Sequence, residues 1–350
     1  GADSLRDIVH GFSLPELAKK TDYFSSMTDG VEKYVKEPHL RDMLKFFIKY
    51  IGSSSDNAPA IMNLLAYSQL GYGEWYVEGG MYNIAKGLER LLDELGVEVN
   101  LEIEIAEILI EMGKAVGIRD GSGVIHPSDY VVSNMEVIPA YKNLMDVPQE
   151  FIRRYEKRFE PSCSGLVLDL GLDTQYLNLA HHNFVFSQDQ SAHFDSVYNK
   201  KKMPEDPTIY LVAPARTDPA VAPPCCVMIK ILPHIPHLQD TPLARQEYIQ
   251  LRERVLDKLE RTVMPGLRDH IVVEDMLLPE DIQRMYYSNR GSIYGVVSDR
   301  KKNKGFRAPK KSELYENLYF VGGSVNPGSG MPMVINSGQM VRDMIVRKEK

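Results

Sequence analysis

The residues with the clearest chemical potential lie near the carboxy-terminal end, where an apolar stretch runs into glycines and then a proline. Residues 318–321 are predicted as a buried strand, 322–330 as a glycine-rich loop, and 332 to about 346 as a helix. Glycines let a ligand approach the backbone closely, and proline suits the first turn of a helix. The N–H groups and positive dipole of such a helix start favour a phosphate or the N1–C2=O edge of a reduced flavin. A surface loop with a capped helix is the plainer alternative.

Segments upstream of this loop have the form of elements that could position it. The helix predicted after Gly79-Gly80 ends at Gly96 and has one apolar face, formed by Ile84, Leu88, Leu91, Leu92 and Leu95. Short strands are predicted at 97–99, 103–105, 108–110, 115–118 and 130–134, with a turn at 120–123. A helix leading into a strand, then a hairpin and another strand, is typical of the second half of a nucleotide-binding α/β unit.

The remaining segments are helical or mixed. Residues 13 to about 70 are predicted as helical, beginning with a capping box formed by Ser13 and Glu16. Strands are predicted at 164–172, 182–187, 208–213 and 225–232, with a long helix at about 242–262. The Cys225-Cys226 pair is assigned to the last of these strands, because buried thiols behave as small hydrophobes.

Composition and charge exclude several function classes. Of 350 residues, 43% are hydrophobic and 25% are charged, as in an ordinary globular protein of one or two domains. The formal net charge of -7 argues against nucleic-acid binding. Three cysteines without a CxxC pair predict neither a disulfide framework nor a zinc site, which favours a reducing, cytoplasmic setting. A proline separates His234 from His237, so no metal site is expected. No apolar run approaches the ~18 residues of a membrane-spanning helix.

Four short elements lie in order along the chain: W-Y-V-E-G-G-M at 75–81, S-D-Y-V-V-S-N at 128–134, G-S-I-Y-G at 291–295 and G-G-S-V-N-P-G-S-G-M-P at 322–332. Together they resemble the motifs of the phytoene desaturase family, the FAD-dependent carotenoid desaturases. Val77 replaces a usual proline in the first element, and Ser128 replaces alanine in the second. The resemblance covers residues 75–340, most of the chain.

The resemblance implies roles for individual residues. Ile105 would lie at the adenine edge, the loop glycines near the pyrophosphate and ribityl chain, and the start of the last helix near the flavin ring. The implied FAD contacts are Ile105, Ser133, Asn134, Gly322, Gly323, Ser324, Pro332, Met333 and Val334. Gly79, Gly80 and Met81 would border the junction between the flavin and a substrate tunnel. No catalytic acid or base is identified.

The implied fold class is α/β with α+β character. It combines the carboxy-terminal part of a Rossmann-like FAD-binding domain with a mixed-sheet substrate domain and a helical cap. The predicted division is 1–74 as the cap facing substrate or membrane, 75–138 as part of the FAD domain, 139–309 as the substrate domain, and 310–350 as the return to the FAD domain.

The first element of the family is absent from the sequence. Family members begin with a strand–GxGxxG–helix turn that holds the pyrophosphate, and no GxGxxG occurs here. We therefore expect the chain to be the carboxy-terminal part of a longer protein, with a natural shortened protein as the alternative. Such a fragment is expected to hold FAD weakly or not at all.

The implied activity is desaturation of a long carotenoid or isoprenoid polyene, with hydride transfer to the flavin and loss of a proton from the neighbouring carbon. An apolar substrate binds by burial, worth ~25 cal/mol per Å², so an apolar tunnel is expected. The apolar faces at 40–51 and 61–70 are candidate walls, and a plain helical core is the alternative.

The same faces would suit a peripheral contact with the inner face of the cytoplasmic membrane. A basic stretch is interpreted as a solvated loop, with contact to anionic lipid headgroups as the alternative. It consists of Arg300, Lys301, Lys302, Lys304 and Arg307.

Two other functions stay open. The same fold could carry out different chemistry, as a saturase, an isomerase or an amine oxidase. Amine-oxidase relatives usually have glutamate after the first glycine of the tail motif, where this chain has Gly323, which argues against that activity. A fragment that folds but retains no cofactor and no activity is the non-enzymatic alternative.

Overall fold

The computed structural model describes residues 3, 22 and 24–349, and the chain divides into two compact units. The first unit consists of Gly1–Gly71, Ile103–Cys163 and Ile282–Lys350, and the second of Tyr72–Glu102 and Ser164–Asp281. Both contain helices and sheets, which confirms the predicted α/β class with α+β character. The predicted capping box of Ser13 and Glu16 lies outside the described residues.

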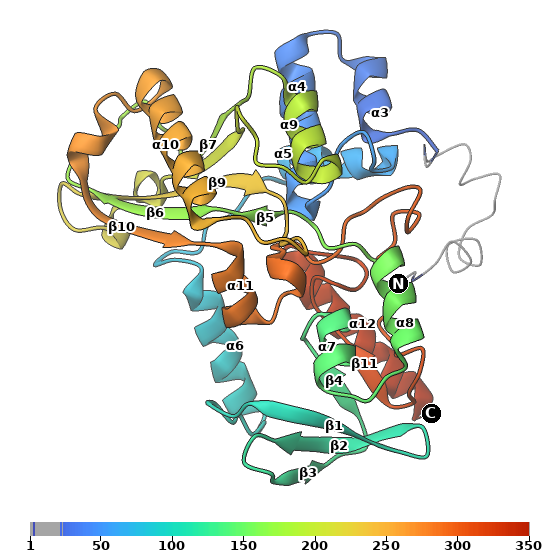
Figure 1. Ribbon diagram of the computed structural model, residues 1–350. Helices are drawn as coiled ribbons and strands as arrows, with labels where there is room; N and C mark the ends of the chain where they lie inside the picture. Colours follow the sequence, from blue (N-terminus) through green and yellow to red (C-terminus); the bar gives the residue numbers. More distant parts are fainter. Residues whose placement is uncertain (1–2, 4–21, 23, 350) are drawn as a thin grey trace. The chain divides into compact units, whose positions relative to one another are not determined.

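A two-stranded parallel sheet in the first unit carries two of the motif-bearing segments (Figure 1). β4 (Val131–Ser133) pairs with β11 (Leu318–Phe320), and Ser133 lies opposite Phe320. Because the strands run in the same direction, the segments that follow them leave the sheet at the same edge. The strands predicted at 130–134 and 318–321 are confirmed, and the predicted final helix is α12 (Met331–Lys348).

Two helices pack aromatic side chains against this sheet. α7 (Val137–Asn143) and α8 (Gln149–Arg158) follow β4 in the chain. The Tyr141 ring lies 5.2 Å from Phe320 and 5.1 Å from Phe151, measured between centroids, and all three residues are buried. Aromatic pairs at this separation add to the stability that burial alone supplies. The core of the first unit therefore packs directly against the end of β11.

A three-stranded antiparallel sheet completes this unit. It is formed by β1 (Ile105–Glu111), β2 (Lys114–Asp120) and β3 (Ile125–Pro127), and it confirms the predicted hairpin and turn. The strand predicted at 97–99, which belongs to the second unit, is wrong. No described strand pairs with these residues, and Val97 and Val99 are 47% and 50% exposed. Without a neighbouring strand the backbone groups have no ladder partners, so the apolar alternation does not produce a strand.

The helical region predicted for residues 13–70 is a series of short helices where it is described. They are α3 (Met27–Tyr34), α4 (Pro38–Phe46), the 3-10 turns Phe47–Ile51 and Ala60–Asn63, and α5 (Leu64–Tyr72). Ser26 and Asp29 form a capping box at the start of α3. Gly52 ends the 3-10 turn Phe47–Ile51 with φ of 67°. A Cβ at Gly52 would lie 2.8 Å from the Cβ of Tyr294, so this position requires glycine. In the described residues, no helix has the length and apolar character needed to cross a bilayer.

The second unit is built on a six-stranded sheet in which every pair is antiparallel. Its strands are β5 (Ser164–Gly165), β6 (Val167–Leu172), β7 (His182–Val185), β8 (Ile209–Val212), β9 (Val227–Ile235) and β10 (Ile271–Leu277). α10 (Arg245–Thr262) packs its apolar face onto the sheet (Figure 1). A strand forms within each of the four predicted ranges, and the long helix is confirmed. The other helices are α6 (Tyr82–Glu94), α9 (Gln190–Phe194) and α11 (Pro279–Tyr286), the last of which crosses the boundary between the units.

The Cys225-Cys226 pair lies before β9, and its predicted place inside the strand is wrong. Cys225 is exposed and has φ of 65°, and the strand begins at Val227. Pro223 and Pro224 immediately precede the pair, and proline has no N–H to donate to a sheet ladder. The strand therefore starts only after the chain has turned.

The two units group the segments differently from the predicted four-part division. α6 belongs to the unit of the six-stranded sheet, whereas β1 to β4 belong with the cap helices and α12. The predicted domain boundaries at 75, 139 and 310 stay a prediction.

Candidate functional site

The glycine-rich loop between β11 and α12 has the form of a ligand cradle. Gly322, Gly328 and Gly330 have φ angles of 100°, 131° and 101°, which residues with a Cβ rarely adopt. α12 begins at Met331, and its N-cap residue Gly330 supplies no side-chain cap. N–H groups of an uncapped first turn and the positive end of the helix dipole favour a negatively charged ligand.

The end of β4 lies beside this loop. Val321 N donates to Ser133 O (2.9 Å), and a Cβ on Gly322 would lie 3.5 Å from Asn134 O. Gly322 N donates to Ser337 Oγ (2.9 Å), which ties the loop to α12. The structure thus brings Ser133, Asn134 and Gly322, three of the predicted cofactor contacts, to one edge of the parallel sheet.

The first turn of α12 carries three further predicted contacts. Pro332 is exposed, Met333 is 40% exposed and Val334 is half-buried, while Met331 beside them is 44% exposed. Apolar side chains that stay exposed at the start of a helix offer a surface against which a flat ring can pack. The glycine conformations, the uncapped helix start and this surface together fit an FAD.

Ser324 and Ile105 have other surroundings. Ser324 is 2% exposed, and its Oγ accepts a hydrogen bond from Val137 N (3.2 Å) at the start of α7. Ile105 is the first residue of β1, where it pairs with Asp120 in a sheet separate from that of β4 and β11. Gly323 is half-buried in the loop itself. The contacts of these three residues with FAD stay predictions.

The three residues predicted to border the substrate tunnel form the turn before α6 in the second unit. Gly79 and Gly80 have φ of 76° and 97°, and Met81 is the N-cap residue of α6. The Asp218 carboxylate holds the turn, because its Oδ2 accepts hydrogen bonds from Gly79 N (2.9 Å) and from Tyr76 Oη (3.2 Å). Their role at the substrate stays a prediction.

Arg307 was missed as a site residue because it ends a basic stretch. Its interpretation as part of a solvated loop is wrong: Arg307 is 2% exposed and donates to the carbonyl oxygens of Tyr294 and Gly323. Lys301 and Lys304, by contrast, are exposed as predicted. A guanidinium tolerates burial when carbonyl oxygens satisfy its donors. The sequence does contain an indication of this burial: Arg307 stands between the apolar residues Phe306 and Ala308, whereas the lysines have no such neighbours.

Glu136 is the second missed residue. It is the N-cap residue of α7, two residues after Asn134, and Ser292 Oγ donates to its Oε1 (3.3 Å). Burial raises the pKa of Glu136 to about 7, although hydrogen bonds and the charge of Arg307 oppose the shift. Burial also lowers the pKa of Arg307 to about 10. A buried guanidinium and a half-buried carboxyl therefore lie close to the glycine-rich loop.

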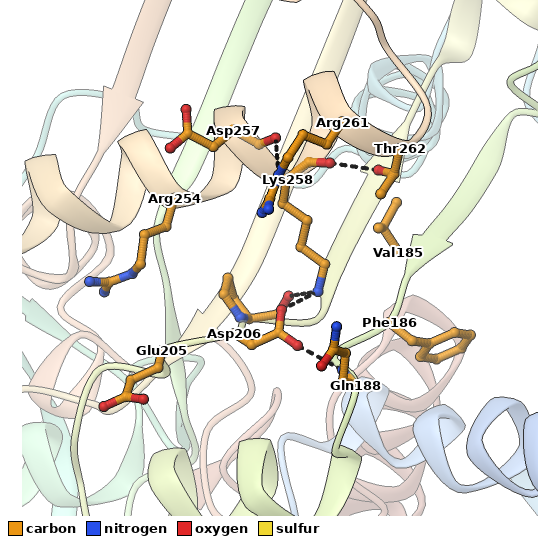
Figure 2. Close-up of a pocket in the computed structure, with 11 residues that line it drawn as sticks. Val185, Phe186, Gln188, Glu205, Asp206, Arg254, Asp257, Lys258, Arg261 and Thr262 are labelled. Atoms are coloured by element: carbon orange, nitrogen blue, oxygen red, sulfur yellow. Dashed lines mark hydrogen bonds and ion pairs between the residues drawn. The ribbon is translucent and has the colours of Figure 1, made fainter.

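A hollow of about 530 Å³ beside β7 and α10 in the second unit has a different character (Figure 2). Lys258 Nζ donates to Asp206 Oδ1 (2.5 Å) and Pro207 O (2.9 Å) within it. Other lining residues carry charge, among them Glu205, Arg254, Asp257 and Arg261. An apolar ligand gains little from such walls, because its affinity comes from apolar burial. We therefore do not assign this hollow to the polyene.

Comparison with known proteins finds a matching family and relatives of similar sequence. The model of the family of flavin-containing amine oxidoreductases matches residues 11–341. A 4,4'-diapolycopene oxygenase of Methylomonas is 54% identical over 347 residues, covering 99% of this chain and 70% of the relative. A 4,4'-diaponeurosporene oxygenase of Staphylococcus haemolyticus is 47% identical over 345 residues, covering 99% of this chain and 69% of the relative.

Solved structures show the same fold at low sequence identity. An oxidoreductase from Methanosarcina mazei has a TM-score of 0.65 at 17% identity, covering 97% of this chain and 75% of that chain. A variant of putrescine oxidase has a TM-score of 0.59 at 12% identity, covering 95% of this chain and 69% of that chain. At these identities the likeness concerns the fold.

Proposed function

Because this chain belongs to the family of flavin-containing amine oxidoreductases, we propose that it acts in an FAD-dependent enzyme that oxidises a long apolar carotenoid polyene. The exposed, uncapped start of α12, which follows a glycine-rich loop that begins beside the end of β4, carries the proposal. The substrate class is carried over from the relatives, whose names state that they oxygenate 4,4'-diapolycopene and 4,4'-diaponeurosporene.

Three predictions are confirmed by these matches. The family match supports the FAD cofactor and the oxidoreductase class, and the relatives support the resemblance to carotenoid desaturase-type flavoenzymes. Gly323, in the place where amine-oxidase relatives usually have glutamate, agrees with a substrate other than an amine.

FAD supplies an acceptor for the hydride that leaves the substrate. The residues of this chain would bind and orient it. The first turn of α12 would face the N1–C2=O edge, where its dipole stabilises negative charge. The glycine-rich loop would run along the pyrophosphate and ribityl chain, and Met331 and Met333 would keep water from the ring.

Two oxidations fit this arrangement. In a desaturation, hydride leaves one carbon, a proton leaves its neighbour, and a double bond forms between them. In an oxygenation, hydride leaves a C–H carbon of the polyene in the same way, and a water molecule supplies the OH group bonded to that carbon and releases a proton. The names of both relatives favour oxygenation as the second candidate.

The mass of the product distinguishes these reactions. We would give the chain, alone and joined to the remaining part of the Methylomonas relative, phytoene or 4,4'-diaponeurosporene in liposomes. Loss of two hydrogens indicates desaturation, and gain of oxygen indicates oxygenation. A yellow, FAD-loaded protein that leaves both polyenes unchanged would contradict the proposed function.

A pair of glycines offers a matched test of the cofactor site. Gly322 and Gly266 both have positive φ, 100° and 72°, so alanine strains the backbone at both, but only Gly322 lies beside Asn134 at the edge of the parallel sheet. We expect Gly322→Ala to weaken FAD binding at least tenfold and Gly266→Ala to leave it unchanged. Quenching of flavin fluorescence measures both. Equal affinities of the two variants for FAD would show that the cofactor does not bind at the glycine-rich loop.

We further propose peripheral contact with the inner face of the cytoplasmic membrane, where such a substrate dissolves. Leu64, Tyr67 and Leu70 of α5 are 58%, 61% and 67% exposed and share one helix face. Leu64→Glu with Leu70→Glu should reduce sedimentation with liposomes. Leu177→Glu, at a leucine that is 72% exposed in the second unit, is the control. Unchanged sedimentation in the double variant would contradict membrane contact through α5.

A further inference from the structure

Arg307 joins three segments that are distant in the sequence. Its Nη1 donates to Tyr294 O (2.5 Å) and to Gly323 O, and its Nη2 donates to Ile51 O (3.1 Å) and Ser329 Oγ (3.3 Å). Ile51 ends the 3-10 turn of the cap, Tyr294 lies in the G-S-I-Y-G element, and the other two lie in the glycine-rich loop. One buried side chain therefore connects the cap, this element and the loop.

The backbone of Arg307 is locked to the same loop. Arg307 N donates to Asn326 Oδ1 (2.9 Å), and Asn326 Nδ2 donates back to Arg307 O (3.2 Å). A Cβ on Gly328 would lie 2.9 Å from Arg307 Nε, so the loop needs glycine there to admit the guanidinium. A Cβ on Gly295 would lie 2.6 Å from Gly323 O. We call Arg307 and its hydrogen bonds to Ile51, Tyr294, Gly323 and Ser329 the clamp. Gly295 and Gly328 leave the space that the clamp needs around Gly323.

The position of the guanidinium also has an electrostatic consequence. Ser329, one of its partners, directly precedes Gly330, the N-cap residue of α12. The positive charge therefore lies behind the positive end of the helix, and a fixed charge in a buried site acts more strongly than one in water. The carbonyl oxygen of Gly323 points to the guanidinium, so it is withdrawn from any anionic ligand in front of the loop.

We propose that Arg307 is a positioning residue for the flavin, which shapes the glycine-rich loop for binding and supplies a fixed positive charge that favours the anionic reduced ring. The proposal rests on the proposed function. It assigns the G-S-I-Y-G element a supporting role, because its Tyr294 carbonyl and Gly295 hold the guanidinium and the Gly323 peptide in place.

Two substitutions separate shape from charge. Arg307→Lys keeps the charge but loses the planar fork that reaches several acceptors at once. It should weaken FAD binding at least tenfold while leaving the midpoint potential close to that of the wild type. Arg307→Met loses both, and should in addition disfavour the reduced flavin at least tenfold, equivalent to a potential about 30 mV more negative. A role limited to folding would not produce this difference between the two variants.

Arg300→Met is the matched control. Arg300 lies in the same unit and also donates to backbone carbonyl oxygens, those of Phe24 (2.7 Å) and Asp56 (3.1 Å), but to none in the glycine-rich loop. It should change neither affinity nor potential. If Arg307→Met folds poorly, Ser329→Ala keeps the guanidinium and removes its contact next to the N-cap, together with the hydrogen bond from Ser329 Oγ to Tyr50 O (3.1 Å). This variant should lower the affinity for FAD severalfold. Wild-type affinity and potential in Arg307→Lys, Arg307→Met and Ser329→Ala would overturn the proposal.

Hydrogen exchange tests the clamp separately from the cofactor. In the chain without FAD, Arg307→Met should exchange the amides of residues 322–330 at least tenfold faster than wild type or Arg300→Met. Unchanged exchange would overturn the role of Arg307 even if the chain binds FAD. Failure of the wild-type chain to bind FAD even when it is joined to the remaining part of the relative would instead contradict the proposed function. Faster loop exchange in Arg307→Met would then still support the role of Arg307 in shaping the loop.

Discussion

Two amphipathic helices of the second unit have opposite environments. In α10, Leu251, Val255, Leu256 and Leu259 are each 0% exposed and pack onto the six-stranded sheet. In α6, no residue is buried, and Leu88, Leu91 and Leu92 are 48%, 48% and 36% exposed. Both faces follow the same periodicity of three and four residues, so the pattern alone does not distinguish them.

The difference shows that an apolar face predicts a partner without locating it. An isolated helix of this length is marginal in water, and most helix stability in proteins comes from packing of an apolar face. The relatives have more chain than this sequence covers, since the matches span 70% and 69% of their lengths. We infer that the α6 face suits packing against chain that the longer relatives contain.

The largest effect is expected in α10. Leu256→Ala removes side-chain atoms from a fully buried position, and should lower the free energy of unfolding by about 2–5 kcal/mol. Urea denaturation followed by circular dichroism measures this change. A loss of less than about 0.5 kcal/mol, the size expected for an exposed site, would remove the contrast between α10 and α6.

The contrast between buried and exposed side chains also applies to an ionisable group, the carboxyl of Glu136 in the first unit. Burial raises the pKa of Glu136 from 4.5 to about 7, so on raising the pH the unfolded chain loses this proton before the folded chain does. The contribution of Glu136 to stability is therefore full below about pH 4.5 and falls as the pH rises to about 7, by about 3 kcal/mol.

Glu136→Gln cannot ionise and should lack this fall. Unfolding of wild type and variant in urea at about pH 5 and about pH 8 gives the comparison, and the variant should be the more stable protein at the higher pH. A difference between the two proteins that does not change with pH would show that the carboxyl is not protonated by burial.

The sequence predicts best those elements whose partners lie within the same unit. Apolar patterns predicted the strands around 131–133 and 318–320 and the helix α10, because the residues that bury these elements lie in the same unit. The strand expected at 97–99 does not form, because no described strand pairs with these residues. The motifs located the glycine-rich loop, but Arg307 and Glu136 were hidden, because burial of a charged side chain depends on acceptors that come from distant segments.

A smaller effect is expected where α6 begins, since hydrogen bonds rather than its apolar face hold it there. Asp218 Oδ2 accepts from Gly79 N and Tyr76 Oη. Asp218→Ala should cost about 1 kcal/mol, the net value of such bonds. Hydrogen exchange should become faster in the turn before α6 and stay unchanged in α10. Equal protection of the turn in both proteins would show that another contact holds α6.

The smallest effect is expected at Leu91 in this chain, and it should grow in a longer one. Leu91→Ala removes an exposed side chain and should change the free energy of unfolding by less than about 0.5 kcal/mol. In a chain joined to the remaining part of the Methylomonas relative, the same substitution should cost about 2–5 kcal/mol if the added chain buries Leu91. Glu89→Ala, on an exposed residue outside the apolar face, is the control in both chains. A small cost for Leu91→Ala in the longer chain as well would mean that the α6 face packs against something other than that chain, such as a lipid surface or a second copy.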